Sequence, residues 1–273
     1  MNGLDENSKY FTYGIVGGLL IIFIVFLIAS IFPIIVNNDS IAIIPIHGEI
    51  SYTGTGVSPE DFKVVLDKAI SDNNVKVIVL DIDSSGGNLL ASQEIKSYVV
   101  NSSKPIVAWI SGSGSTYSYL IASSANKIVA NPNSVIGTNG FNYLSADLRD
   151  YYYKLGVNSN SDLGNTFNTI YPNYYNLSSS QRNSVDLMLS IDLKYFIDTV
   201  KEDRDINSSL VNFENGKIYN SENALNNNLI DYIGDESKAL EVAASLSNMH
   251  QYRIVNFNDT RGFFDTFMDL ITK

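Results

Sequence analysis

Few residues in this chain could support chemistry through a thiol or an imidazole. There is no cysteine, which excludes thiol nucleophiles, disulfides and thiolate metal sites. The two histidines are His47 and His250, and a Ser-His-Asp triad or a histidine-rich metal site would have to use one of them. His47 ends an apolar run and His250 lies near the end of a helix-like segment. A structural or exposed position is therefore the favoured interpretation of both.

Two turns rich in serine and glycine are better candidates for a site. Asp83 to Asn88 follows an apolar, β-branched run, and Ser111 to Ser115 leads into a helix that should begin near Thr116. A glycine pair that opens a helix lets backbone N–H groups turn toward a ligand, such as the oxyanion of a tetrahedral intermediate. A plain tight turn is the alternative. Ser115 and Thr116 are candidate nucleophiles, and capping of the helix is the alternative role of their hydroxyls.

The elements that must position these turns alternate between strand and helix. Apolar runs predict strands, and capped periodic segments predict helices. Pro45 limits the first strand to an edge or an irregular position. The rhythm implies parallel strands with right-handed crossovers. The expected strands are 41–46, 75–82, 104–110 and 127–130, and the expected helices are 58–71, 89–99, 116–125, 145–155 and 178–200, with a polar loop over 156–176.

An uncharged apolar stretch over 13–36 precedes these elements. About 20 apolar residues span a bilayer core, so we expect a retained signal anchor and a single-pass protein of the cell membrane. Lys9 is the only basic residue before the stretch, which favours a cytoplasmic N-terminus and an extracytoplasmic domain. The expected organisation is a cytoplasmic tail over 1–12, the anchor over 13–36, one domain over 40–245 and a C-terminal extension over 246–273.

Composition supports a folded domain and argues against several partners. The 273 residues are 45% hydrophobic and 17% charged, which is ordinary for a globular chain. The net charge is −11 and no cluster of lysine or arginine is present, so binding to nucleic acid or to anionic headgroups is not expected.

The order of several short motifs resembles the SppA (signal peptide peptidase) family of serine peptidases. A strand, then Asp83-Ser-Ser-Gly86-Gly87, then a helix, is similar to the family's Asp-Ser-Pro-Gly-Gly. The resemblance continues to about Gly234 and implies an α/β fold of the ClpP/crotonase type, a βαβ domain with C-terminal helices. The further matching pieces are Ala125-Asn-Lys-Ile128, Gly137-Thr-Asn-Gly140, Lys154-Leu-Gly-Val157, Asn215-Gly-Lys-Ile-Tyr219 and Leu229-Ile-Asp231.

The same resemblance implies a serine nucleophile activated by a lysine, and both positions are altered here. The family's nucleophile position falls on Thr116, with Ser115 one residue earlier, and Tyr117 stands where the family has a glycine. Ser161 stands at the family's lysine position. A serine cannot accept a proton near neutral pH as a lysine of lowered pKa can. The resemblance further implies that Gly86 and Gly87, with the Tyr117 backbone, form the oxyanion or substrate-binding side of the site.

Two classes of function remain open. The protein is a non-cleaving relative that handles hydrophobic or signal-peptide-derived peptides, or an active endopeptidase that uses Thr116 or Ser115 with an unidentified base. A crotonase-type acyl-CoA activity is a distant third. The resemblance implies a homo-oligomer or co-assembly with an active paralogue through the long C-terminal helices, and it implies no metal, nucleotide or other cofactor.

Overall fold

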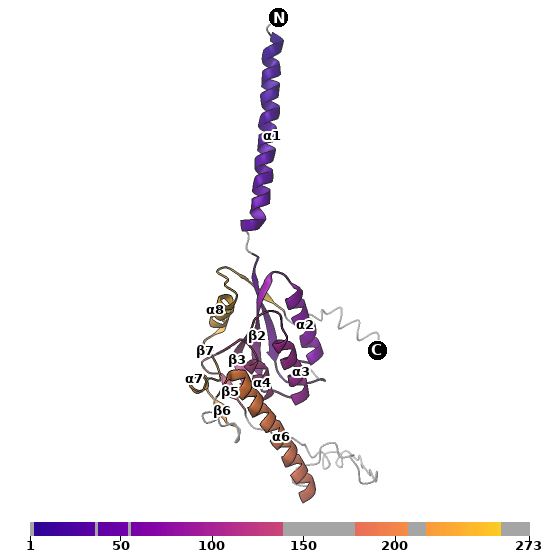
Figure 1. Cartoon of the computed structure of the whole chain (residues 1–273), viewed down its shortest axis with the longest axis vertical. Helices are drawn as coiled ribbons and strands as arrows, with labels where there is room; N and C mark the ends of the chain where they lie inside the picture. Colours follow the sequence, from indigo (N-terminus) through magenta and orange to yellow (C-terminus); the bar gives the residue numbers. More distant parts are fainter. Residues whose placement is uncertain (1–2, 36–37, 54–55, 139–177, 207–216, 258–273) are drawn as a thin grey trace, which may run out of the picture.

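The fold is of the α/β type and is built around an eight-stranded sheet, in which one strand pair is antiparallel and the others are parallel (Figure 1). A computed structural model describes residues 3–35, 38–53, 56–138, 178–206 and 217–257. The order in the sheet is β6-β5-β3-β2-β1-β8, with β4 beside β3 and β7 beside β4. The strands are β1 Ser40–His47, β2 Val75–Ser84, β3 Ile106–Ser115, β4 Lys127–Ala130, β5 Val135–Gly137, β6 Ile218–Tyr219, β7 Tyr232–Ile233 and β8 Arg253–Asn256.

The helices within the described residues follow the strands in alternation. Their bounds are α1 Gly3–Ile35, α2 Pro59–Ser71, α3 Leu89–Val100, α4 Tyr117–Ser123, α6 Ser179–Arg204, α7 Ser221–Asn226 and α8 Glu236–Leu246. The predicted start of α2 is confirmed, because Ser58 caps it through the Asp61 N–H and Pro59 holds the first position. The capping box of Ser178 and Gln181 at the start of α6 is confirmed as well.

The central strands are parallel and buried on both faces, as their continuous apolar runs predict. Residues of one parity, such as Ile78 and Leu80 of β2, pack toward α2, α3 and α4 in the larger core cluster. Residues of the other parity, such as Val77 and Val79, pack toward α8 in the smaller one. The sheet is therefore a layer between helices.

β3 is longer than its apolar run predicts. The expectation that Ser111 to Ser115 forms a turn is wrong, because the strand continues through Ser115. The first half of β3 pairs with β4 and its last three residues pair with β5, while Gly114 lies opposite Ser84 of β2. A Cβ on Gly114 would lie 2.8 Å from the Ile110 side chain, so the small residues allow a close strand rather than marking a turn.

β1 lies near one edge of the sheet, in agreement with the position expected from Pro45. Its first half is covered on the outer side by β8, which pairs with Ser40 to Ile43. β8 falls within the segment expected as a C-terminal extension, so the sheet includes part of that segment. The expected helix over 145–155, the loop over 156–176 and Ser161 lie outside the described residues.

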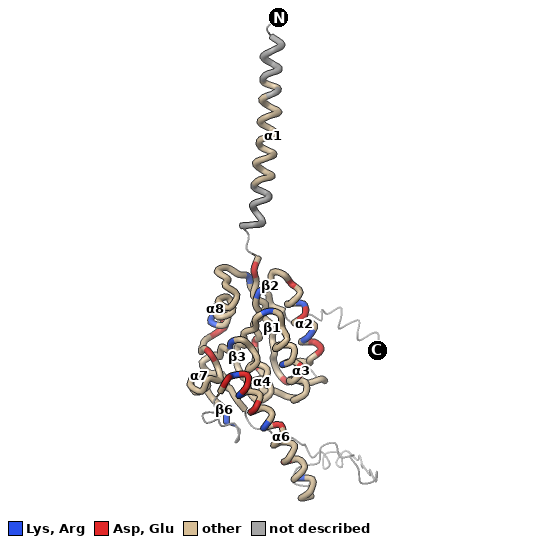
Figure 2. The backbone as a smooth tube through the Cα atoms, in the orientation of Figure 1, with Lys and Arg blue, Asp and Glu red and all other residues tan. Residues whose placement is uncertain are grey.

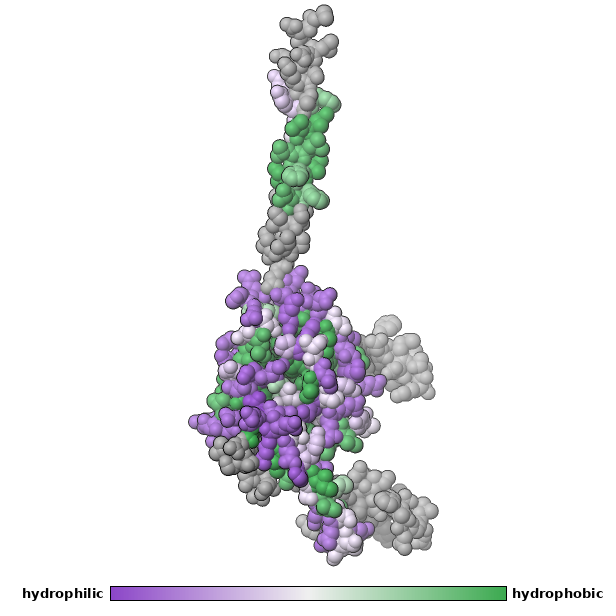
Figure 3. Space-filling view, viewed as in Figure 1, coloured by the Kyte–Doolittle hydropathy of each residue, from purple (hydrophilic) through white to green (hydrophobic). Residues whose placement is uncertain are grey.

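α1 projects away from the domain as a single helix of 33 residues (Figure 1). Its described side chains are largely apolar and exposed, and Figure 3 shows them as a continuous hydrophobic surface. Within the described part of the chain, none of the helices meets the joint requirement of length and hydropathy for crossing a bilayer.

Candidate active site

Thr116 occupies a sharp bend between β3 and α4. Its backbone has φ 54° and ψ −120°, a conformation that a β-branched residue adopts only at a cost of about 1–3 kcal/mol. The Thr116 side chain makes no capping hydrogen bond to α4, so the capping role is absent here. Strain of this kind is typical of functional sites, including the strand-to-helix turns that present a nucleophile.

The glycine turn after β2 lies directly against this bend. A Cβ on Gly86 would lie 3.0 Å from the Tyr117 backbone nitrogen and 3.5 Å from the Thr116 Cβ. Gly86 and Gly87 have φ of +104° and +148°, values that favour glycine. The two turns therefore converge as expected, because the carboxyl ends of parallel strands meet at one edge of the sheet.

The glycine turn is fixed from its other side by the segment after β1. The Ile50 N–H donates to the Gly86 carbonyl (2.9 Å), and the Asn88 N–H donates to the Ile50 carbonyl (2.7 Å). These two bonds pass on either side of Gly87, whose own N–H makes no hydrogen bond to a described residue. Within the described residues, a backbone donor is thus left for a ligand in the glycine turn that lies against the Thr116 bend.

Ser118 joins the two turns from below. Its fully buried hydroxyl donates to the Ser84 carbonyl (2.6 Å) and lies 2.9 Å from the Ser115 carbonyl. Ser118 was not among the site residues expected from the sequence. A small polar residue two positions after the nucleophile position was the available signal.

The structure distinguishes between the two candidate nucleophiles. Ser115 is the last residue of β3, is 2% exposed, and its hydroxyl lies 3.2 Å from that of Ser113. Ser115 pairs with Gly137 of β5, so it belongs to the sheet. Thr116 alone stands at the bend that presents a side chain to the glycine turn.

The described lysines do not approach either hydroxyl. Those with a side-chain hydrogen bond or ion pair contact carboxylates or carbonyls elsewhere, as Lys96 does with Asp203 (3.0 Å) and Lys127 with Asp231 (3.0 Å). No hydrogen bond or cation–π contact of a described lysine involves Ser115 or Thr116.

The histidines do not form a triad with these residues. His47 Nε2 lies 2.9 Å from Asp81 Oδ2, while Asp81 Oδ1 accepts the Ser111 hydroxyl at 2.5 Å. The aspartate stands between the other two, so the histidine cannot take the serine proton directly. His250 is exposed. No cluster of potential metal ligands is found among the described residues.

The Tyr117 side chain interacts electrostatically with Asp192 of α6. Burial raises the pKa of its phenol, and the negative charge of Asp192 raises it further. Desolvation also raises the pKa of the Asp192 carboxyl. A phenol and a carboxyl group, each with a raised pKa, therefore lie near one another on the side of the bend where the family has glycine. Asp192 was not a candidate in the sequence because it lies in a long, amphipathic helix.

Comparison with known proteins assigns the chain to a family. The family model of peptidase family S49 matches residues 98–250, which is more than half of the chain and includes the bend at Thr116. The chain belongs to peptidase family S49. This confirms the resemblance to the SppA family.

Curated relatives agree with this assignment, and one solved structure shares the fold. The putative protease MJ0651 of Methanocaldococcus jannaschii is 27% identical, over 77% of this chain and 71% of the relative. The putative signal peptide peptidase SppA of Enterococcus faecium is 22% identical, over 85% and 71%. Protease 4 of Salmonella typhi is 27% identical over 74% of this chain, which spans only 33% of that protein. A mutant of the 1510-N membrane-bound stomatin-specific protease is 15% identical and has a TM-score of 0.51, over 81% of this chain and 94% of the other. It matches the mixed α/β fold.

Proposed function

We propose that this S49 protein binds hydrophobic peptides, such as the remnants of signal peptides, and does not cleave them. The observation that carries the proposal is the bend at Thr116 against the glycine turn. Among the described residues the Gly87 N–H has no hydrogen-bond acceptor, which supports binding of a peptide carbonyl there. The binding half of a peptidase site is thus retained.

The catalytic half is altered at both of its positions. Thr116 has the hydroxyl of a nucleophile, but its methyl group restricts χ1 and crowds the approach to a carbonyl. Ser161 stands at the lysine position of the family and offers no base near neutral pH. No hydrogen bond or ion pair joins a described lysine to Thr116 or Ser115, which supports the absence of a substitute base from that part of the chain.

An active threonine-type endopeptidase is the second candidate function, and one observation favours it. Thr116 keeps a strained backbone that costs stability and that a peptide-binding turn would not need. In this alternative Thr116 is the nucleophile rather than Ser115, and the base comes from a residue outside the described part of the chain or from another subunit.

The localisation that we propose follows from α1. It projects away from the domain (Figure 1) and its described side chains are largely apolar and exposed. The uncharged stretch over 13–36 is long enough for a single-pass anchor. The single Lys9 before it favours an extracytoplasmic domain. Protease accessibility of the domain in intact and in opened cells tests this orientation.

We propose self-association through α6. Leu187, Met188, Ile191 and Tyr195 lie on one face of this helix and are exposed, and the first half of α6 extends beyond the body of the domain (Figure 1). An unpaired apolar stripe of this kind is typical of an interface. A second copy or an active paralogue is the partner. Loss of the oligomer in Ile191→Asp, but not in the polar control Ser190→Asp, tests the surface.

The activity test uses the full chain in detergent with quenched hydrophobic peptides. We expect little or no turnover by the native protein, and none by Ser161→Lys alone, because Thr116 and Tyr117 still crowd the site. The double change Thr116→Ser with Ser161→Lys is expected to give the higher rate. Robust native cleavage that Thr116→Ala abolishes and Ser115→Ala leaves intact would establish the endopeptidase alternative.

A further inference from the structure

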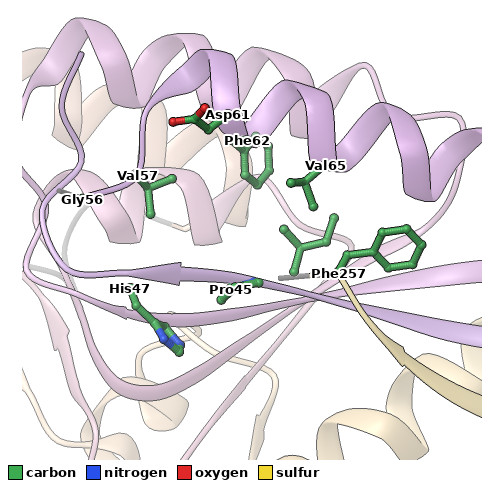
Figure 4. Close-up of a pocket in the computed structure, with 9 residues that line it drawn as sticks. Pro45, His47, Gly56, Val57, Asp61, Phe62, Val65 and Phe257 are labelled. Atoms are coloured by element: carbon green, nitrogen blue, oxygen red, sulfur yellow. The ribbon is translucent and has the colours of Figure 1, made fainter. Parts of the chain in front are cut away.

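A second candidate site lies at the outer edge of the sheet, where β1 passes under α2 (Figure 4). The cavity holds about 220 Å³. The lining is mostly apolar and also includes two polar residues. The apolar side chains are those of Ile44, Val57, Phe62, Val65 and Phe257, and the polar residues are His47 and Asp61 (Figure 4). Pockets that enclose whole small molecules are usually larger, about 300–1,000 Å³. The dimensions and lining therefore suit one large apolar side chain better than a cofactor.

In the part of the chain that the structure describes, the backbone beside the cavity is an unpaired strand edge. Successive residues of a strand direct their N–H and C=O groups to alternate sides. The Asp39 and Ile43 carbonyls face outward, because they accept from Arg253 and Phe257 of the β8 segment. By the same alternation, the Pro45 carbonyl and the His47 N–H also face outward. The register of β8 ends at Ile43, so no described strand pairs with these two groups.

Pro45 itself makes this edge selective. It has no N–H, so the edge offers one acceptor and one donor separated by two residues. An incoming strand would pair with the Pro45 carbonyl and the His47 N–H, and every second side chain of that strand would face the α2 side of the sheet. Ile44, whose side chain is on that same side, lines the cavity.

We propose that this edge binds an extended segment of the hydrophobic peptide as an added β-strand, with one large apolar side chain in the cavity. The identity of the ligand rests on the proposed function. Main-chain pairing gives affinity without strict sequence demands, and the cavity selects the side chain. The edge acts as a second holding point for a peptide whose carbonyl lies at Thr116.

The link between the two sites is short. His47 ends β1, and the Gly48 N–H donates to the Asp83 carbonyl (3.0 Å) at the start of the glycine turn. Ile50, three residues after His47, holds both sides of Gly87 through its backbone. Three extended residues span about 10 Å, so one peptide of modest length can reach from the strand edge to the glycine turn.

The absence of native cysteine allows a direct test by disulfide trapping on the full chain. Val57→Cys places a thiol at the cavity, and Val64→Cys is the matched control, because Val64 is 49% exposed and does not line the cavity. The probe is a ten-residue leucine- and valine-rich peptide with one cysteine, under reversible thiol exchange. We expect at least tenfold more adduct with Val57→Cys. Equal trapping at the two positions overturns the proposal.

Two further pairs of variants separate the cavity from the strand edge. In the Val57→Cys background, Val65→Phe fills the cavity and is expected to reduce trapping about tenfold, while Val64→Phe leaves it unchanged. His47→Pro removes the edge N–H and is expected to reduce trapping similarly, while His47→Ala keeps the N–H and the trapping. Thermal melts identify a variant that fails to fold. If His47→Pro does not fold, hydrogen exchange of the His47 amide in the native protein is measured instead. We expect the peptide to slow this exchange at least tenfold.

Failure of this proposal is distinguishable from failure of the proposed function. Thr116→Ala is expected to reduce trapping at Val57→Cys less than Val65→Phe does, because Thr116 holds the same peptide but is not part of the cavity. Peptide binding that depends on Thr116 without selective trapping retains the proposed function and overturns the strand-edge site. Selective trapping without any dependence of peptide binding on Thr116 retains the strand-edge site and overturns the proposed function.

Discussion

The two turns that form the candidate site solve the same geometric problem in different ways. The turn after β2 uses Gly86 and Gly87 at positive φ, where glycine adopts the conformation without steric cost. The turn after β3 reaches positive φ with Thr116, which is among the residues least suited to it. Glycine would have less backbone strain than threonine at the second turn as well.

This difference indicates what each turn is for. The first turn needs a bare backbone, because Ile50 and the Thr116 bend pack against it from two sides. The second turn needs a side chain at its apex, and the domain accepts the strain that follows. Selection for stability alone would not keep a threonine there.

The largest effect that tests this comparison is expected from Gly87→Ala. A Cβ at Gly87 would lie 2.2 Å from the Ile50 carbonyl oxygen, at φ +148°. Strain and overpacking together should lower the free energy of unfolding by about 3 kcal/mol or more, measured by urea titration. Gly48→Ala is the matched control, because Gly48 has φ +79° but open space around it. An equal loss in both variants would mean that packing against Ile50 contributes nothing.

Ser118→Ala should give the next largest effect. The change leaves the buried Ser84 carbonyl without its hydroxyl donor, which typically costs about 1–3 kcal/mol. The control is Ser124→Ala, whose hydroxyl bonds only to Ile121 of its own helix and should cost less. Hydrogen exchange of the Gly86 amide should rise in Ser118→Ala and remain unchanged in the control.

The order of strands and helices from β1 to β4, and the start of α6, could be predicted from sequence because local signals agreed with the tertiary structure. The elements β5 to β8, α7 and α8 were not among the expected strands and helices. Ser58-Pro59 and the Ser178 capping box began helices where expected, and β-branched runs gave the buried strands. The length of β3 could not be predicted, because Ser111 to Ser115 has the composition of a turn. Only its pairing with Ser84 and with β5 holds it as a strand.

The position of the site was accessible from sequence, but its internal geometry was not. The glycine pair and the serine-rich turn each follow a parallel strand, so their convergence could be expected. The choice between Ser115 and Thr116 depended on one residue of strand length, which sequence patterns do not resolve. The contacts of Ser118 and Asp192 join elements far apart in the chain, and no local pattern encodes them.

Thr116→Gly is expected to stabilise the protein while removing the hydroxyl. Relief of the strain at φ 54° outweighs the added chain entropy of glycine, for a net gain of about 1 kcal/mol. Thr116→Ser is the matched control, since it keeps the hydroxyl and a Cβ at the same φ, and it should gain much less. A loss of stability in Thr116→Gly, measured by thermal melting, would contradict the assignment of strain to this turn.

The smallest effect is expected from Asp192, whose charge raises the pKa of Tyr117 beside the second turn. Burial raises its pKa in the folded state above the ordinary value, so the folded protein holds this proton more tightly than the unfolded chain does. The resulting stabilisation is complete below the ordinary pKa and is lost as pH rises through the raised pKa. Asp192→Asn cannot ionise, so its urea midpoint relative to the native protein should rise between pH 3.5 and 7. Glu202→Gln, on the exposed face of the same helix, should show no such trend.

The pairing of β1 with β8 has a consequence for the birth of the protein on the ribosome. β1 and β2 are complete once Ser84 has emerged, but the strand that covers the outer side of β1 begins only at Arg253. At ~5–20 residues per second, the intervening chain takes roughly 10–30 s to synthesise. During that interval the whole outer edge of β1 stays open to pairing with other nascent chains. Chaperone dependence of this protein should therefore begin after Ser84 is released and decline when β8 is released.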